Sequence, residues 1–290
     1  MSAQPILVCG AGMMGHGIAQ VFAAAGHPVT LYEPELARAD AGLARIAGNL
    51  ERAVAKGRLS GEERDAQLAR IQVRSDLARA ARGAALVVEA VFEEEAVKRT
   101  LLADLDRLAP PDAVLASNTS SISITRLAAA VSPERRARVV GMHFFSPVPV
   151  MPLVELVRGA ETSDGTEAAV RAWAAAIGKQ VIASRDRPGF IVNRILMPYL
   201  AEAMRACEEG LGTAEDIDAG ARLGLNHPMG PLELADFIGL DVCLHVMDVL
   251  HEGFGQAHFA PPRVLRELVE AGHLGQKTGR GFHEYPRRGQ

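Results

Sequence analysis

The chain has 290 residues, of which 48% are hydrophobic and 23% are charged, and its formal net charge is −4 at pH 7. This length and composition predict a large buried core divided between two domains, and the negative net charge argues against generic nucleic-acid binding. No apolar run reaches the roughly 18 residues of a membrane span, and Cys9, Cys207 and Cys243 are too scattered for a disulfide framework or a zinc site. We therefore expect a cytoplasmic protein with no membrane, nucleic-acid or metal partner.

A glycine-rich loop follows the first apolar run of the chain. Residues Pro5–Cys9 predict a short buried strand and Ile18–Ala25 predict a helix. The loop between them consists of Gly10, Ala11, Gly12, Met13, Met14 and Gly15. Strand, glycines and helix in this order are typical of a dinucleotide site, because the helix N-terminus offers free N–H groups to a pyrophosphate. A second predicted strand, Val29–Tyr32, leads to Glu33, an acid placed to bind the adenosine ribose hydroxyls.

The next part of the chain alternates between helical and apolar segments. Residues 34–70 are polar with a helical period, and Gly57 and Ser60-Gly61 separate two predicted helices. Further short buried strands are predicted at Ile71–Val73, Ala85–Glu89 and Ala113–Ala116. Strands that alternate with helices predict a parallel, doubly wound α/β sheet of the Rossmann type.

Three groups of polar residues mark candidate ligand contacts in this region. Glu89–Glu93 ends one predicted strand, with Lys98 on the following helix, and Ser117–Ser121 ends the next strand. Ligands of open α/β sheets bind at the carboxyl ends of strands, so both segments are candidate site residues. The basic run from Arg52 to Arg58 is either a solvated helix face or a contact for ligand phosphates.

A histidine and a glutamate occupy two neighbouring predicted strands. The segment Val139–Glu155 places His143 near the end of an apolar strand, turns through Ser146 and Pro147, and reaches Glu155 in a second apolar run. Two strands joined by a turn bring these side chains within hydrogen-bond reach, and an imidazole oriented by a carboxylate is a general base. The alternative is a buried structural histidine beside a strand glutamate.

The last hundred residues are predicted to be mainly helical. A helix at Gly165–Ile177 and a strand at Gln180–Ala183 precede the polar connection at Arg185–Pro188. The helices expected beyond it are Phe190–Glu209, Thr213–Leu223, Leu232–Leu250 and Pro262–Ala271. Such a helical region leaves apolar surface to cover, which favours self-association.

Seven motifs, taken in order, resemble those of a known enzyme family. They are GAGMMG (Gly10–Gly15), VVEAVFEEEAVK, SNTSS, HFFSPVP, PGFIVNR (Pro188–Arg194), HPMGP (His227–Pro231) and GQKTGRGF (Gly275–Phe282). Together they are similar to the short-chain L-3-hydroxyacyl-CoA dehydrogenases, which include bacterial 3-hydroxybutyryl-CoA dehydrogenases. The resemblance covers nearly the whole chain and implies an NAD-binding domain at residues 1–185. It also implies an all-helical substrate and dimerisation domain at residues 186–290.

The resemblance also implies a reaction and a set of site residues. NAD-dependent oxidation of a (3S)-3-hydroxyacyl-CoA, and the reverse reduction, would use His143 as the base and Glu155 as its partner. Ser120 and Asn193 would bind the reacting oxygen and hold the substrate, and Lys56 and Arg58 would contact the acyl-CoA. The cofactor residues implied are Gly10, Ala11, Gly12, Met13, Met14, Gly15, Glu33, Ala90, Val91, Glu93, Lys98 and Asn118.

One residue departs from the family pattern and leaves the substrate open. Ser146 stands where the family commonly has asparagine, and its single hydroxyl replaces an amide. The acyl chain length and the choice between a CoA and a carrier-protein thioester remain open. Two alternatives also remain, which are a dehydrogenase of a free hydroxy or sugar acid and a nucleotide-binding homologue without catalysis.

Overall fold

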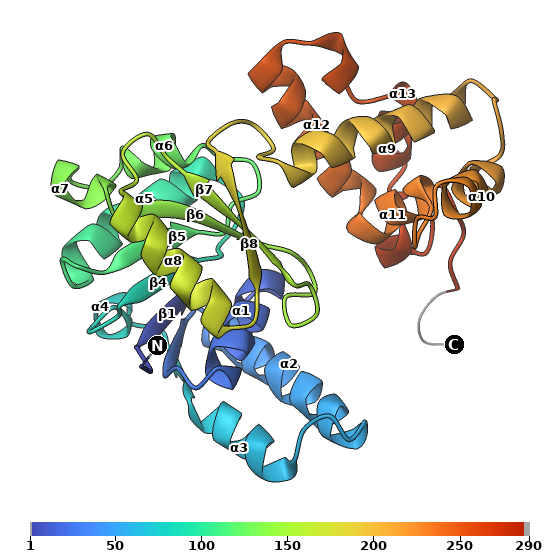
Figure 1. Cartoon of the computed structure of the whole chain (residues 1–290). Helices are drawn as coiled ribbons and strands as arrows, with labels where there is room; N and C mark the ends of the chain where they lie inside the picture. The colour runs from blue at the N-terminus through green and yellow to red at the C-terminus, as the bar shows by residue number, and fades with distance from the viewer. Residues whose placement is uncertain (1, 287–290) are drawn as a thin grey trace. The chain divides into compact units, whose positions relative to one another are not determined.

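The computed structural model describes residues 2–286 of the chain (Figure 1). The chain divides into two compact units, Met1–Arg187 and Pro188–Gln290. The first unit combines a sheet with helices, and the second is built from helices. The expected combination of a doubly wound α/β region and an all-helical region is therefore confirmed.

Eight strands form one sheet within the described part of the first unit. They are β1 (Ile6–Cys9), β2 (Val29–Tyr32), β3 (Ile71–Arg74), β4 (Leu86–Glu89), β5 (Val114–Ser117), β6 (Val139–Phe144), β7 (Leu153–Arg158) and β8 (Gln180–Arg185). Their order is β3-β2-β1-β4-β5-β6-β7-β8. Strands β1 to β6 pair in parallel, β7 runs antiparallel to β6, and β8 is parallel to β7.

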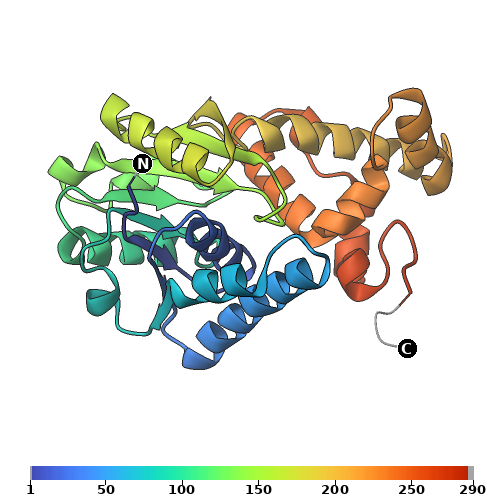
Figure 2. The same ribbon diagram turned by 60° about the horizontal axis from the view of Figure 1, so that its bottom comes forward.

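Helices cover both faces of this sheet. On one face, α1 (Met13–Ala24), α2 (Leu36–Ala55) and α8 (Asp164–Ala176) contribute to a core with alternate residues of the strands. Helix α3 (Gly61–Ala69) lies beside α2 (Figure 2). The opposite face is covered by α4 (Leu77–Ala80), α5 (Glu95–Leu108) and α6 (Ile124–Ala128), and α7 (Pro133–Arg136) follows. The predicted doubly wound arrangement follows from strands that are apolar on both sides.

The strand predicted at Ile71–Val73 forms, but the prediction that it is buried is wrong. Strand β3 is at the edge of the sheet, where it has one neighbour, and only Ile71 of its four residues is buried. Gln72 and Arg74 are exposed because the short helices beside this edge do not cover them. A run of three residues cannot distinguish an edge strand from a central one, since both contain β-branched residues.

The second unit contains five α-helices within its described residues. They are α9 (Val192–Glu208), α10 (Ala214–Gly224), α11 (Pro231–Ile238), α12 (Leu240–Phe254) and α13 (Arg263–Glu270), with 3-10 turns η1 (Ala257–Phe259) and η2 (Gln276–Thr278). The expected single helix over Leu232–Leu250 is wrong. Gly239 adopts a φ of 104° and divides it into α11 and α12, which pack in one core with α9. The apolar period continues across this glycine, so the pattern alone did not reveal the break.

Two buried aspartates hold the last described segment of the chain against the helices. Asp236 of α11 accepts hydrogen bonds from the Phe282 and His283 N–H groups and from the Tyr285 hydroxyl. His283 also contacts Asp218 of α10, with 2.7 Å between Nε2 and the carboxylate. Burial raises the pKa of Asp236 above its usual value. The glycine-rich motif near the C-terminus thus closes over α10 and α11.

We expect Gly141→Ala to destabilise the first unit. A Cβ at Gly141 in β6 would lie 2.7 Å from Val157 Cβ and 3.0 Å from Ile124 Cδ1, so neighbouring backbone elements would have to move. Overpacking of this kind costs about 1–3 kcal/mol of unfolding free energy. Urea denaturation followed by fluorescence of Trp173, the one tryptophan of the chain, reports on this unit.

Gly165→Ala in α8 is the matched control for this substitution. Its Cβ would meet only Ser163 Oγ at 3.9 Å, so its unfolding free energy should stay within about 0.5 kcal/mol of the wild type. Equal midpoints for the two variants would contradict the close packing proposed at β6.

Candidate active site

The carboxyl ends of the parallel strands gather at one edge of the sheet. Because β1, β4, β5 and β6 are parallel, Cys9, Glu89, Ser117 and Phe144 end their strands at the same edge. The sheet order reverses at β1, which has β2 on one side and β4 on the other. Crevices at such a switch point are the usual ligand sites of open α/β sheets.

The glycine-rich loop has the geometry of an anion-binding turn. Gly10 has a φ of 102°, and a Cβ there would lie 2.5 Å from the Ala90 carbonyl oxygen. A Cβ at Gly15 would lie 1.8 Å from the Gly10 oxygen, so the turn closes only with glycine at both positions. Gly12 caps α1 without a side-chain hydrogen bond, and a Cβ at this residue would meet no atom within 4 Å. The open space and the uncapped helix N-terminus fit the pyrophosphate of a dinucleotide.

Glu33 lies next to this loop, directly after β2. Its side chain is largely buried, and Oε2 accepts a hydrogen bond of 3.1 Å from the Ala11 N–H. A Cβ at Gly42 of α2 would lie 2.8 Å from the Ala11 oxygen, so α2 presses closely on the same loop. The carboxylate is thereby fixed in position beside the glycine-rich loop.

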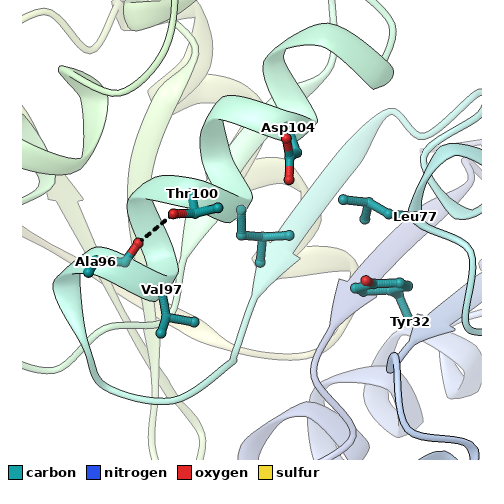
Figure 3. A pocket seen from close by; sticks show the side chains of 7 residues that line it. Tyr32, Leu77, Ala96, Val97, Thr100 and Asp104 are labelled. Atoms are coloured by element: carbon teal, nitrogen blue, oxygen red, sulfur yellow. Dashed lines mark hydrogen bonds between the residues drawn. The ribbon is translucent and has the colours of Figure 1, made fainter.

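A pocket of about 400 Å³ lies between Tyr32 at the end of β2 and helix α5 (Figure 3). Tyr32 and Leu77 face Ala96, Val97, Thr100 and Asp104 of α5 across it. Thr100 donates a hydrogen bond of 2.9 Å to the Ala96 carbonyl and so does not offer this hydrogen to the pocket. The pocket is a mainly apolar hollow that begins at the residue before Glu33.

His143 and Glu155 are directly opposite each other in the antiparallel β6–β7 pair. His143 Nδ1 lies 2.9 Å from Glu155 Oε2, and the carboxylate is fully buried. Donation from Nδ1–H to the carboxylate gives the tautomer in which Nε2 carries the basic lone pair. The Phe145 ring packs against the imidazole at 4.6 Å between centroids. The structure thus pairs the two residues in the way that the sequence suggested.

The loop after β5 is held by one carboxylate oxygen of Glu93. This Oε1 accepts hydrogen bonds from the hydroxyls of Thr119, Ser120 and Ser121 and from the backbone N–H groups of Ser120 and Ser121. Burial would raise the pKa of Glu93, but attraction to Lys98 and the hydrogen bonds from Thr119 and Ser120 outweigh it and hold the pKa below its usual value. Glu93 therefore fixes the hydroxyl of Ser120.

Lys98 is buried beneath this loop and bridges two glutamates. Its Nζ lies 2.6 Å from Glu89 Oε1 and 3.2 Å from Glu93 Oε2. Glu89 also accepts hydrogen bonds from the Val91 N–H and the Ser117 hydroxyl. Sequence reasoning placed Glu89 in a candidate segment, Glu89–Glu93, but gave a cofactor role only to other residues of this region, among them Val91, Glu93 and Lys98.

Backbone contacts fasten the remaining predicted cofactor residues to the strand ends. The Ala90 N–H donates to the Cys9 carbonyl, and Asn118 Oδ1 accepts a hydrogen bond of 2.8 Å from the Phe144 N–H. Asn118 thus connects the end of β5 to the end of β6, one residue beyond His143. The glycine-rich loop, residues 89–93 and residues 117–121 consequently form one framework.

Lys179 holds the loop between β6 and β7, a role that sequence reasoning missed. Its Nζ donates hydrogen bonds of 2.6 Å to the Val148 and Met151 carbonyls, and burial lowers its pKa. Val148 in turn packs against Gly17 of α1, where a Cβ would lie 2.9 Å from Val148 Cβ. Ser146 is exposed in this loop and precedes a cis peptide bond to Pro147. A lysine before a strand carries no pattern that would indicate this role.

Three further predicted site residues belong to other segments of the chain. Lys56 and Arg58 are exposed at the turn between α2 and α3. Asn193 is in the first turn of α9 in the second unit. Its neighbour Arg194 is placed by two rings of the same unit, with the guanidinium carbon 3.9 Å from the Phe254 centroid and 4.1 Å from the Phe259 centroid.

Residues 2–286 contain neither a metal-binding cluster nor a membrane-spanning helix. No group of three or more histidine, cysteine, aspartate or glutamate side chains in this part of the chain is arranged to hold a metal ion. No described helix combines the length and apolar character needed to cross a bilayer.

Two consecutive segments of the chain match the two domains of one enzyme family. Residues 5–187 match the NAD-binding domain of 3-hydroxyacyl-CoA dehydrogenase. Residues 189–285 match the C-terminal domain of the same enzyme.

Individual relatives match over almost the whole chain. A 3-hydroxybutyryl-CoA dehydrogenase of Mycobacterium tuberculosis is 49% identical over 284 residues, which cover 97% of this chain and 98% of the relative. One of Bradyrhizobium diazoefficiens is 50% identical over 96% of this chain and 94% of its own. The crystal structure of (S)-3-hydroxybutyryl-CoA dehydrogenase from Ralstonia eutropha superimposes with a TM-score of 0.94 at 45% identity, over 99% of this chain and all of that one.

Proposed function

The chain belongs to the 3-hydroxyacyl-CoA dehydrogenase family of NAD-dependent oxidoreductases, and we propose that it oxidises a short-chain (3S)-3-hydroxyacyl-CoA such as 3-hydroxybutyryl-CoA. The reverse reduction uses the same groups. The observation that carries the proposal is the buried His143–Glu155 pair, 2.9 Å apart at the edge of the sheet where the glycine-rich loop also lies.

In this proposal His143 acts as the general base. With Nδ1–H bonded to Glu155, Nε2 takes the proton of the substrate β-hydroxyl, and the carboxylate stabilises the resulting imidazolium. Ser120, fixed by Glu93, and Asn193 bind the reacting oxygen. Bound NAD supplies the hydride acceptor.

The cofactor is proposed to bind along the carboxyl edge of the sheet. Backbone N–H groups of Gly10–Gly15 and the N-terminus of α1 would bind the pyrophosphate, and Glu33 would bind the ribose. Residues 90–93, Lys98 and Asn118 would shape the reactive end of the site. The open position at Gly12 and the fixed carboxylate of Glu33 support this placement.

The acyl-CoA part of the proposal is supported by charge and by relatives. Lys56 and Arg58 are exposed and positively charged, which suits the phosphates of CoA. The relatives named above act, by name, on 3-hydroxybutyryl-CoA. A panel of acetoacetyl-CoA, longer 3-oxoacyl-CoA thioesters, the carrier-protein thioester and free acetoacetate distinguishes the alternatives.

The catalytic role of the His143–Glu155 pair is tested by Glu155→Gln and His143→Ala. Glutamine keeps the size of the side chain but removes the charge that stabilises the imidazolium, so turnover of acetoacetyl-CoA should fall on the order of 100-fold. NADH affinity should stay nearly unchanged, because the proposed cofactor contacts lie on other strands. Turnover is followed as loss of NADH absorbance, with the melting temperature measured alongside. Near-normal turnover of folded Glu155→Gln would show that the pair is structural.

Cofactor choice is expected to follow from Glu33. Its carboxylate can accept bonds from two ribose hydroxyls but repels a 2′-phosphate, so we expect an NAD preference of about 100-fold in kcat/KM. Glu33→Gln should reduce the preference for NAD, mainly by raising kcat/KM with NADPH. Comparable efficiency of the wild type with NADPH would contradict the role of Glu33.

We also propose a homodimer formed through the second unit, in the cytoplasm. Leu211 and Leu223 are 82% and 87% exposed in the single chain, which favours burial by a second copy. The free thiols of Cys9, Cys207 and Cys243 fit a reducing compartment.

Light scattering should therefore give about twice the chain mass of 30.9 kDa. Leu223→Glu places a charge on the proposed interface and should shift the protein toward the monomer. Leu36→Glu changes an apolar residue of the first unit that is 61% exposed and should remain dimeric. A wild-type monomer at micromolar concentration would refute the proposal.

A further inference from the structure

A group of three charges, two of them buried, lies beneath the loop that carries Ser120. Glu89 and Lys98 are 0% and 1% exposed, and the Glu93 side chain is 30% exposed. Lys98 Nζ lies between the two carboxylates, 2.6 Å from Glu89 and 3.2 Å from Glu93. We call these residues the Glu89–Lys98–Glu93 cluster.

Both side-chain oxygens of Glu89 accept hydrogen bonds. Oε1 accepts from the Val91 N–H and from the Lys98 ammonium. Oε2 accepts a hydrogen bond of 2.6 Å from the Ser117 hydroxyl. Each oxygen of Glu89 therefore faces a donor, which is the arrangement of an ionised, acceptor-only group.

Glu93 is a carboxylate for a similar reason. Its Oε1 faces backbone N–H groups that can only donate, and Oε2 faces Lys98. These contacts hold the pKa of Glu93 below its usual value despite its partial burial. Two carboxylates and one ammonium leave the cluster with one net negative charge.

The charge lies beside the place where the proposed reaction occurs. Ser120 donates to Glu93 Oε1, and the reacting carbon must lie near both Ser120 and the nicotinamide ring for hydride to pass between them. NAD⁺ and NADH differ by one positive charge, which is on that ring. A nearby negative charge therefore attracts the oxidised form more strongly than the reduced form, and burial reduces its screening by salt.

We propose that the net negative charge of the Glu89–Lys98–Glu93 cluster favours NAD⁺ over NADH. The inference rests on the proposed function, since it requires a nicotinamide cofactor at this edge of the sheet. In the proposal Lys98 neutralises one glutamate, and the other remains uncompensated. The cluster thus sets the ratio of the two cofactor affinities in addition to shaping the loop.

Glu89→Gln tests the proposal by neutralising the cluster with little change of shape. The dissociation constants of NAD⁺ and NADH are measured by calorimetry and by NADH fluorescence on the same protein. The ratio of the NAD⁺ dissociation constant to the NADH dissociation constant should rise about fivefold, because only the positively charged NAD⁺ ring loses an electrostatic attraction. Glu93→Gln also removes one negative charge from the cluster and should change the ratio in the same direction. It provides the test if Glu89→Gln fails to fold.

Two control variants separate charge from packing. Ser117→Ala removes a hydrogen bond of Glu89 without changing the charge, and Glu94→Gln removes a charge that is exposed in the same segment. Both should leave the ratio within about twofold of the wild type. An unchanged ratio in folded Glu89→Gln and Glu93→Gln, or an equal loss of both affinities, would overturn the inference. A wild type that binds neither cofactor form would overturn the proposed function as well.

Discussion

The parallel register of β1, β4, β5 and β6 is the constraint on which the first unit depends. It brings four strand ends to one edge, so that side chains more than a hundred residues apart in the chain share a site. The glycines keep that edge compact, since a Cβ at Gly10 would clash with the Ala90 carbonyl and a Cβ at Gly15 would clash with the Gly10 oxygen. A side chain at either position would separate the loop from β4. The framework is consequently rigid before any ligand arrives, which favours precise placement of a cofactor.

The reversal of chain direction after β6 gives His143 its carboxylate partner. A parallel partner strand would need a long crossover, whereas the antiparallel β7 follows after a short loop and places Glu155 directly opposite His143. Lys179 fastens that loop through the Val148 and Met151 carbonyls. The pairing of acid and imidazole is thus specified by sheet register, which a shift of one residue would abolish because it would turn Glu155 to the other face.

Sequence reasoning identified features that have a local pattern and missed those that depend on tertiary contacts. The order of strand, glycines and helix and the His143–Glu155 pair are readable because residues close together in the sequence create them. The break at Gly239 was not readable, since the apolar period continues through it. Lys179 was missed because it acts on a segment distant in the chain, and a lysine at a strand boundary is usually solvated.

Three buried carboxylates at the same edge differ in what surrounds them. Glu33 accepts from a backbone N–H, Glu155 faces an imidazole, and Glu89 faces an ammonium and a hydroxyl. A carboxylate bonded to fixed backbone retains acceptor capacity for a ligand, and one bonded to an imidazole can stabilise a proton gained there. The carboxylate paired with Lys98 has its charge balanced locally, so Glu93 can contribute uncompensated charge while it orders Ser120. The donor set around each acid, more than the residue type, therefore determines what it does.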